Sequence, residues 1–395
     1  MKIVYFNIPA HGHVNPTLPL AAELVRRGHQ LIYYGFPDFE HQIRSTGAEF
    51  RAYPIDFEDF KTMKFDNMLF ILWRLIHVSD ILTNEILPTI AAAPPDLILH
   101  DSMASWGRYI GRAANIPAVS TCVVFAFDPV LGKIPSWRLL GKLCYDWFTN
   151  WRYFMETRAI IHRLAKTYHF KPHLPVELFN NYEKNNIVFT AQSIQPFGKQ
   201  YDLSRYHFVG CSIAKRPDSA DFSWAFRNKQ PLIYVSLGTL MGKDGAFFKT
   251  IMAAFANAPY QLLISIGQFL EIEDLCEIPR NAVVKKQVPQ LDVLQQAAVF
   301  VTHAGLNSLN ESVYYGVPMV MVPQQIEQDY NARHFAKLGC GILAKPNSEA
   351  LLSAVSAILN NDFYRKKCQK YSIDLQNAGG YLRAVDIIEQ IGNIQ

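Results

Sequence analysis

Two histidines and one aspartate are the residues in the first part of the chain best suited to acid-base chemistry. His11 and His13 lie in the segment Pro9-Ala-His-Gly-His-Val-Asn-Pro16, which follows a short apolar run, and Asp101 comes directly after another apolar run. If both runs are parallel strands of one sheet, their carboxyl ends meet at the edge where open α/β sheets bind ligands. A carboxylate bonded to one imidazole nitrogen prepares the other nitrogen to take a proton. His13 and Asp101 are therefore candidates for a proton-accepting pair, although the same loop could also bind an anion or a metal.

Other roles stay open for these residues on sequence alone. An H-x-H pair after a first strand also suits a metal-dependent hydrolase, in which His11 and His13 would be joined by ligands such as His100 and Asp101. A histidine at this place could instead cap a helix, and Asp101 could be the N-cap of the next helix. The metal site is the weaker interpretation, because eight evenly spaced strand and helix units are not visible.

The most specific pattern lies in the second half of the chain, where small polar residues, glycines and prolines follow one another at fixed spacing. Such a string is far less frequent by chance than a single short motif. It comprises Gln287-Val-Pro-Gln-Leu-Asp-Val-Leu294, His303-Ala-Gly-Leu-Asn-Ser-Leu-Asn-Glu-Ser312, Gly316-Val-Pro318 and Pro323-Gln-Gln-Ile-Glu-Gln328.

The middle of this string predicts an anion site. A strand ending at Thr302 is expected to feed a loop and a helix that opens at about Asn307. Free N–H groups and the dipole at a helix N-terminus attract anions, and His303 and Ser308 add donors. One turn further on, Glu311 can accept hydrogen bonds from a ribose. A diphosphate that carries a ribose fits this arrangement, whereas a helix start without a ligand would not explain the whole string.

Short apolar runs alternate with amphipathic stretches in both halves of the chain. One helix is predicted from Asn15 to Gly28, because Asn15 is a good N-cap and is followed by Pro16. Another is predicted from Ala104 to Ala114. The alternation predicts an α/β protein with two domains, each built on a mostly parallel sheet. The predicted strands are Lys2 to Asn7, Leu31 to Tyr34, Asp96 to His100, Pro117 to Thr121, Pro231 to Ser236, Tyr260 to Ser265, Ala298 to Thr302 and Pro318 to Val322.

The length of 395 residues also suits two domains. We expect a first domain over 1–214, a polar linker over 215–230 and a second domain over 231–378. The final segment, 379–395, holds an amphipathic helix from Tyr381 to Ile391 that could pack on either domain. A helical, aromatic and basic segment from about Leu131 to Pro175 interrupts the first domain and is interpreted as an insertion.

Composition and charge exclude several classes of protein. The 38 basic and 34 acidic residues are too balanced for a protein that binds nucleic acid with its whole surface. No apolar run reaches the length of a membrane span, and Met1 to Pro9 is too short for a signal peptide. The six cysteines are scattered without a C-x-x-C pair, which is typical of a reducing compartment. We therefore expect a cytoplasmic protein.

Taken together, these motifs resemble those of the family 1 glycosyltransferases, which include plant secondary-product and bacterial macrolide enzymes. The string from Gln287 to Gln328 is similar to their nucleotide-sugar signature, and Gly12-His-Val-Asn-Pro16 resembles the N-terminal motif of the bacterial members. Ser236-Leu-Gly-Thr239 matches the loop that opens their second domain, and Ala378-Gly-Gly380 is similar too. The motifs follow the family's order over nearly the whole chain.

The resemblance implies the GT-B fold, an α/β architecture of two Rossmann-like domains that face each other across a cleft. The acceptor would bind mainly to the first domain and a UDP-sugar mainly to the second, and the last helix would cross back to the first. By position, His13 would be the general base and Asp101 its partner. Val288 would face the uracil, Glu311 the ribose, and Glu327 with Gln328 the donor sugar. The diphosphate would be bound by Ser236, Gly238, Thr239, His303, Gly305, Asn307 and Ser308.

The resemblance implies a reaction that inverts the anomeric carbon of the sugar and needs no metal or other cofactor. Glucose is the sugar that the family usually transfers. No D-x-D sequence occurs, so the carboxylates that clamp a metal in the other large glycosyltransferase fold are missing. Gln287 stands where plant members carry a tryptophan that stacks on uracil, a departure from the family pattern that bears on the choice of nucleobase. A UDP-sugar epimerase on the same fold and the metal-dependent hydrolase are the alternatives.

Aromatic and apolar segments of the first domain are expected to line the acceptor site, and we call them the acceptor wall. They predict a small hydrophobic acceptor with a hydroxyl group, such as a phenol, flavonoid, macrolide, sterol or carotenoid-like molecule. They are Met63 to Trp73, Met103 to Trp106, Val123 to Phe127 and the insertion. Between Val130 and Lys171, eight basic residues stand against two acidic ones, so the insertion could also touch an anionic membrane weakly. A solvated charged face is the more ordinary interpretation.

Overall fold

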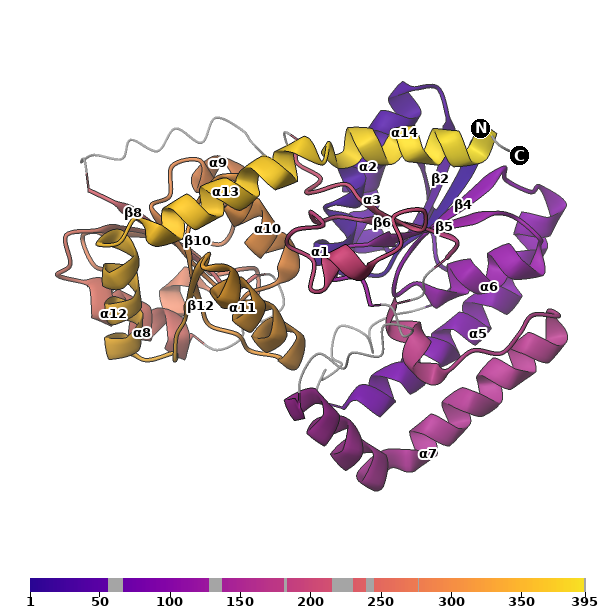
Figure 1. Cartoon of the computed structure of the whole chain (residues 1–395), viewed down its shortest axis with the longest axis horizontal. Coiled ribbons are helices and arrows are strands. Elements are labelled where there is room, and N and C mark those ends of the chain that lie inside the picture. Colours follow the sequence, from indigo (N-terminus) through magenta and orange to yellow (C-terminus); the bar gives the residue numbers. More distant parts are fainter. Residues whose placement is uncertain are drawn as a thin grey trace. The chain divides into compact units, whose positions relative to one another are not determined.

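The computed structural model describes residues 1–55, 67–127, 137–180, 183–214, 230–238, 245–275 and 277–393. The chain forms two compact units, one of Met1–Ser212 with Ala378–Gln395 and one of Ile213–Asn377 (Figure 1). Nearly all of the linker predicted over 215–230 lies outside the described residues.

The first unit is built on a seven-stranded sheet in the order β3-β2-β1-β4-β5-β6-β7, and every neighbouring pair is parallel. The central strands are almost completely buried, as expected of a parallel sheet covered on both faces. The strands are β1 (Lys2–Phe6), β2 (Gln30–Gly35), β3 (Glu49–Ala52), β4 (Leu97–Asp101), β5 (Ala118–Cys122), β6 (Asn185–Val188) and β7 (Tyr206–Phe208).

The helices of this unit are α1 (His11–Val14), α2 (Thr17–Arg26), α3 (Glu40–Arg44), α5 (Met68–Ala92), α6 (Ser105–Ala113), α7 (Trp137–Thr167) and α14 (Gly380–Asn393). The prediction that Asn15 caps the first helix is wrong. Asn15 has helical φ and ψ angles of −54° and −43°, because the chain is already helical from His11, and its N–H donates to His11 O. The helix then resumes at Thr17, after Pro16, which has no N–H to donate.

Helix α14 packs on α2 of the first unit (Figure 1). Arg27 at the end of α2 donates to Asp386 and to Glu389, each over 2.8 Å, and His29 Nε2 lies 2.9 Å from Glu389. Ala384, Val385 and Ile388 of α14 belong to the same hydrophobic core as β1 and β2. The end of the chain is therefore part of the first unit, although more than 350 residues separate Arg27 from Glu389.

The predicted insertion contains the long helix α7, which packs against α5 (Figure 1). Leu69, Leu72 and Ile76 of α5 share a buried cluster with residues of α7 such as Ile161. Phe148 and Trp151 are exposed to 83% and 54% on the first part of α7, near its non-helical residue Asn150. Residues 128–136, where the insertion begins, lie outside the described part. Within the ranges that the structure describes, none of the helices has the length and apolar character needed to cross a membrane.

The second unit repeats the architecture with six parallel strands in the order β10-β9-β8-β11-β12-β13. The strands are β8 (Leu232–Ser236), β9 (Gln261–Ser265), β10 (Ala282–Lys285), β11 (Val299–Thr302), β12 (Met319–Met321) and β13 (Gly341–Leu343). The helices are α8 (Ala246–Phe255), α9 (Gln290–Leu294), α10 (Leu306–Tyr314), α11 (Ile326–Leu338), α12 (Ser348–Leu359) and α13 (Phe363–Asn377). The two units thus have the doubly wound strand order of Rossmann folds, as the sequence predicts.

Candidate active site

The strand order creates a ligand-binding edge in each unit. In the first sheet, the chain leaves β1 toward β2 on one side, whereas β4 lies on the other side of β1. Crevices form at such reversals, outside the carboxyl ends of the two strands. His13 follows β1 and Asp101 is the last residue of β4, so both stand at this point.

His13 and Asp101 are bonded to each other. His13 Nδ1 lies 2.8 Å from Asp101 Oδ2, and the other carboxylate oxygen, Oδ1, accepts the main-chain N–H of Met103 over 2.8 Å. The Asp101 side chain is fully buried, while that of His13 is 14% exposed. A carboxylate can only accept, so beside it the neutral form of His13 holds its ring proton on Nδ1 and keeps a lone pair on Nε2. The structure therefore brings the predicted pair together.

The other roles considered for these residues are not supported by the geometry. Asp101 does not cap α6, whose N-cap is Ala104. The His11 ring packs edge-on against Phe39 with its centroid 4.8 Å away, and burial lowers the His11 pKa. His100 contacts α6, since a Cβ atom at Gly107 would lie 2.4 Å from His100 Cβ. Among the residues that the structure describes, no three His, Cys, Asp or Glu side chains gather into a metal site.

The second unit has its own reversal, between β8 and β11. These strands are neighbours in register, with Thr302 opposite Ser236, so their following loops meet at one edge. The Ser236 hydroxyl accepts the N–H of Gly238 over 3.3 Å. His303 follows β11 directly. Thr239, which was expected in the same loop, lies outside the described residues.

The His303 ring is held between two glycines. A Cβ atom added at Gly238 would lie 2.7 Å from His303 Cε1, and one added at Gly305 would lie 2.7 Å from His303 Nε2. Gly238 also has a φ of +77°, in the left-handed region that favours glycine. Burial lowers the pKa of His303 to about 4, which the nearby Ser236 main chain opposes only in part. The imidazole is therefore neutral at pH 7 and can offer one N–H but no positive charge.

Helix α10 begins as the sequence predicts, with Gly305 as its N-cap and with Asn307 and Ser308 in its first turn. Glu311, one turn further on, is only 6% exposed. Gln290 of α9 donates to Glu311 Oε2 over 2.6 Å and contacts the Ser308 hydroxyl at 3.4 Å. Gln290 was not predicted as a site residue, although it belongs to the recognised string, because its link to α10 arises only in the fold.

The remaining predicted donor residues lie in two further segments. Gln287 is exposed and Val288 half-buried in the loop between β10 and α9. Glu327, in the first turn of α11, accepts from Asn331 Nδ2 over 2.5 Å, and Asn331 also donates to the main-chain oxygen of Ala304 over 3.3 Å. The hydrogen bond from Asn331 to Ala304 ties α11 to the loop that contains His303. Gln328 is turned inward, where its side-chain oxygen accepts the N–H of Gln324 over 2.9 Å.

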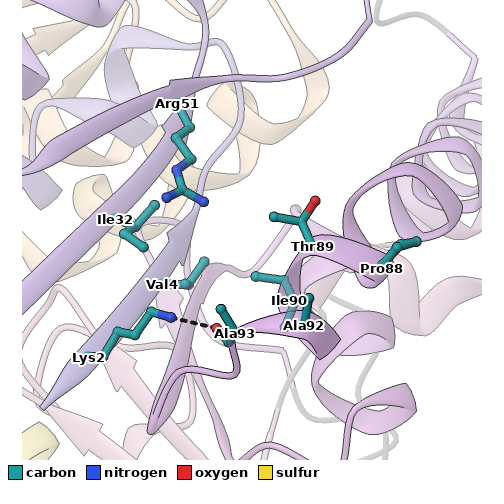
Figure 2. Close-up of a pocket in the computed structure, with 9 residues that line it drawn as sticks. All are labelled: Lys2, Val4, Ile32, Arg51, Pro88, Thr89, Ile90, Ala92 and Ala93. Atoms are coloured by element: carbon teal, nitrogen blue, oxygen red, sulfur yellow. Dashed lines mark hydrogen bonds between the residues drawn. The ribbon is translucent and has the colours of Figure 1, made fainter.

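The predicted acceptor wall is corrected in part. Trp106 is completely buried beside the sheet, and its Nε1 donates to the Tyr53 hydroxyl over 3.0 Å, so it belongs to the core. Trp73, Phe125 and Phe127 are half-buried, while residues 63–66 lie outside the described part. A pocket near Lys2, Arg51 and the end of α5 (Figure 2) lies toward the amino end of β1, whereas His13 follows its carboxyl end. That pocket is not part of the His13 site.

Comparison with known proteins identifies relatives of this chain. Residues 158–375 match the family described as UDP-glucoronosyl and UDP-glucosyl transferase. The NDP-glycosyltransferase YjiC of Bacillus licheniformis is 31% identical over 98% of this chain and 96% of its own. The oleandomycin glycosyltransferase of Streptomyces antibioticus is 29% identical over 98% of this chain and 90% of its own.

Solved structures show the same fold. The calicheamicin glycosyltransferase CalG4 is 26% identical and superposes with a TM-score of 0.82 over 98% of this chain and 97% of its own. The glycosyltransferase of kitacinnamycin, at 24% identity, gives a TM-score of 0.84 over 98% of both chains. The α/β fold is therefore GT-B. The chain is a glycosyltransferase that belongs to the UDP-glucoronosyl and UDP-glucosyl transferase family, and this match gives no support to the epimerase or hydrolase alternatives.

Proposed function

We propose that this glycosyltransferase moves a hexose, glucose in the first instance, from UDP to a hydroxyl group of a small hydrophobic acceptor, with inversion and without a metal ion. The hydrogen bond between His13 Nδ1 and Asp101 Oδ2 carries the proposal. It leaves Nε2 to take the proton of the acceptor hydroxyl, whose oxygen then attacks the anomeric carbon. The UDP leaves from the opposite face of the sugar, and the carboxylate stabilises the imidazolium that forms.

The second unit supports the donor half of the proposal. Charge develops on the leaving diphosphate, and the N-terminus of α10 together with a neutral His303 offers oriented donors for it. His303 Nδ1 is buried and makes no hydrogen bond within the described part of the chain, and the ring lies next to the Ser236 main chain. Gln290 donates to the carboxylate of Glu311, which would accept hydrogen bonds from the ribose hydroxyls. Ser236, Gly238, Thr239, Asn307 and Ser308 would complete the diphosphate site, and Glu327 and Gln328 would bind the sugar.

The acceptor class rests on the half-buried aromatic residues of the first unit and on the relatives. The relatives include an oleandomycin glycosyltransferase and a zeaxanthin glucosyltransferase. Oleandomycin and zeaxanthin are both large hydroxylated lipophilic molecules. We extend that class to this chain. Weak contact of the α7 segment with an anionic membrane stays a prediction.

Incubation of the purified chain with UDP-glucose and a panel of flavonoids, macrolides and carotenoids, followed by mass spectrometry, tests this function. We expect a gain of one hexose on an acceptor, unchanged by EDTA. A parallel incubation with TDP-glucose tests whether an enzyme with Gln287 at this position also accepts thymine in place of uracil as the nucleobase of the donor. Conversion of UDP-glucose without any acceptor would instead indicate an epimerase, and loss of the product in EDTA would contradict the metal-free mechanism.

The glycine beside His303 allows a separate prediction about donor binding. Gly305→Ala is expected to raise the Kd for UDP by about tenfold or more, because the new methyl group must displace the His303 ring. Backbone strain is not involved, since Gly305 has ordinary angles of −64° and 136°. Gly245→Ala is the matched control, because among the described residues the nearest atom to a Cβ there is Leu275 Cδ2, at 3.6 Å. Calorimetric titration with UDP compares the two, and equal affinities would remove His303 from the diphosphate site.

A further inference from the structure

Asn7 is a buried amide at the carboxyl end of β1, immediately before the segment that carries His13. Its side chain is enclosed, with 1% of the residue exposed. The Nδ2 atom lies 3.2 Å from His13 O, 3.2 Å from Thr17 Oγ1 and 2.6 Å from the Tyr33 hydroxyl. The Oδ1 atom accepts the N–H of Ile8 over 2.7 Å. Both polar atoms of the amide are therefore satisfied inside the protein.

The same residue is linked to the element that follows Asp101. The Tyr53 hydroxyl accepts the main-chain N–H of Asn7 and donates to its main-chain oxygen, each over 3.0 Å. Trp106 Nε1 donates to the same hydroxyl over 3.0 Å. Trp106 lies in the first turn of α6, five residues after Asp101. One continuous network thus joins the main chain at His13 to the helix that begins beside its carboxylate partner.

Thr17 closes the network on the side of His13. Its hydroxyl donates to Val14 O over 2.7 Å and lies 2.8 Å from the Tyr33 hydroxyl. Thr17 and Tyr33 are both fully buried, so solvent water does not compete for the hydrogen bonds of their hydroxyl groups. The short helix α1 has no side-chain N-cap of its own. The position of its His13 turn therefore depends on hydrogen bonds that come from Asn7 and Thr17.

We infer that Asn7 is a positioning residue, which holds the main chain at His13 so that the imidazole meets Asp101 and faces the acceptor. This inference rests on the proposed function, because it assigns Asn7 a part in placing the general base. An amide is needed because the groups around Nδ2 include a carbonyl oxygen, which can only accept. An apolar side chain would leave His13 O and Tyr33 without this partner.

Asn186 provides a matched control in the same sheet. It is also fully buried, in β6, and its Nδ2 donates to the main-chain oxygens of Glu183 and Arg205. Its Oδ1 accepts the N–H of Glu183 over 2.7 Å. Asn186 therefore holds loops together as Asn7 does, but none of these bonds reaches His13 or Asp101.

Asn7→Ala is expected to lower kcat by about 10- to 100-fold, since small displacements of a catalytic group cost that much. The KM for the donor should stay within about twofold, and the acidic limb of the pH profile of kcat should move. Asn186→Ala should change neither the folded enzyme's kcat nor its pH profile. If Asn7→Ala does not fold, Thr17→Val is measured in the same way and is expected to lower kcat at least about threefold.

A folded Asn7→Ala or Thr17→Val variant with the kcat and pH profile of Asn186→Ala would overturn the inference. His13→Ala distinguishes this failure from a failure of the proposed function. If His13→Ala loses turnover while Asn7→Ala does not, only the positioning role of Asn7 falls. If His13→Ala keeps its turnover, the general base itself has been misassigned.

Discussion

Replacing His13 by alanine is expected to lower kcat by about 100- to 10,000-fold, which corresponds to about 3 to 5 kcal/mol of activation free energy. The loss follows because the acceptor hydroxyl then has no base to take its proton. The Kd for UDP should not change, since the diphosphate and ribose sites proposed above lie in the second unit. Single-turnover transfer assays and calorimetric titration with UDP measure the two effects separately.

His11→Ala is the control for that substitution. His11 lies two residues away and packs against Phe39, whereas the hydrogen bond to Asp101 is made by His13. Its removal should leave kcat within about threefold of the unmodified enzyme. Equal losses in the two variants would point instead to a site that uses both histidines, as a metal centre would.

Asp101→Asn is expected to lower kcat by a comparable factor, on the order of 100- to 10,000-fold. Met103 N–H donates to Asp101 Oδ1, so the amide oxygen of the new asparagine will occupy that position and turn its NH₂ group toward His13. His13 Nδ1 must then accept rather than donate, which moves the ring proton to Nε2. The nitrogen that should receive the acceptor's proton is thereby blocked, while the shape of the site is kept.

Asp96→Asn serves as the matched control. Asp96 precedes the opposite end of the same strand, β4, and its carboxylate also accepts a main-chain N–H, that of Lys2, over 2.7 Å. The two substitutions change the same atoms, so only a specific role of Asp101 makes them differ. Similar kcat values in Asp101→Asn and Asp96→Asn would remove Asp101 from the mechanism.

Much of the fold is predictable from local sequence. Short apolar runs such as Lys2 to Phe6 and Val299 to Thr302 mark buried parallel strands, because both of their faces are covered. The start of α10 was predicted from the glycine-containing loop after Thr302 and from Asn307 and Ser308, which lie in its first turn. Short edge strands, such as Tyr206–Phe208 and Gly341–Leu343, were not predicted, since three residues carry too little periodicity to be distinguished from a loop.

The site depends more strongly on tertiary structure. The sequence indicates that His13 and Asp101 could meet, but their bond requires that β4 lie beside β1, which local patterns do not specify. The room for the His303 ring depends on Gly238, 65 residues earlier in the chain, and the Glu311 carboxylate is held by Gln290. Trp106 was expected in an acceptor wall and lies in the core, because composition does not tell which face of a helix a side chain occupies.

The most direct test of direct displacement by a base-activated hydroxyl is the anomeric configuration of the product. Donor UDP-α-glucose is incubated with the chain and an acceptor found in the mass screen, and the purified glucoside is examined by proton NMR. Attack by the acceptor oxygen opposite to the departing UDP predicts a β-glucoside. An α-glucoside would contradict the account, because the reaction would then retain configuration and could not proceed in one displacement aided by His13.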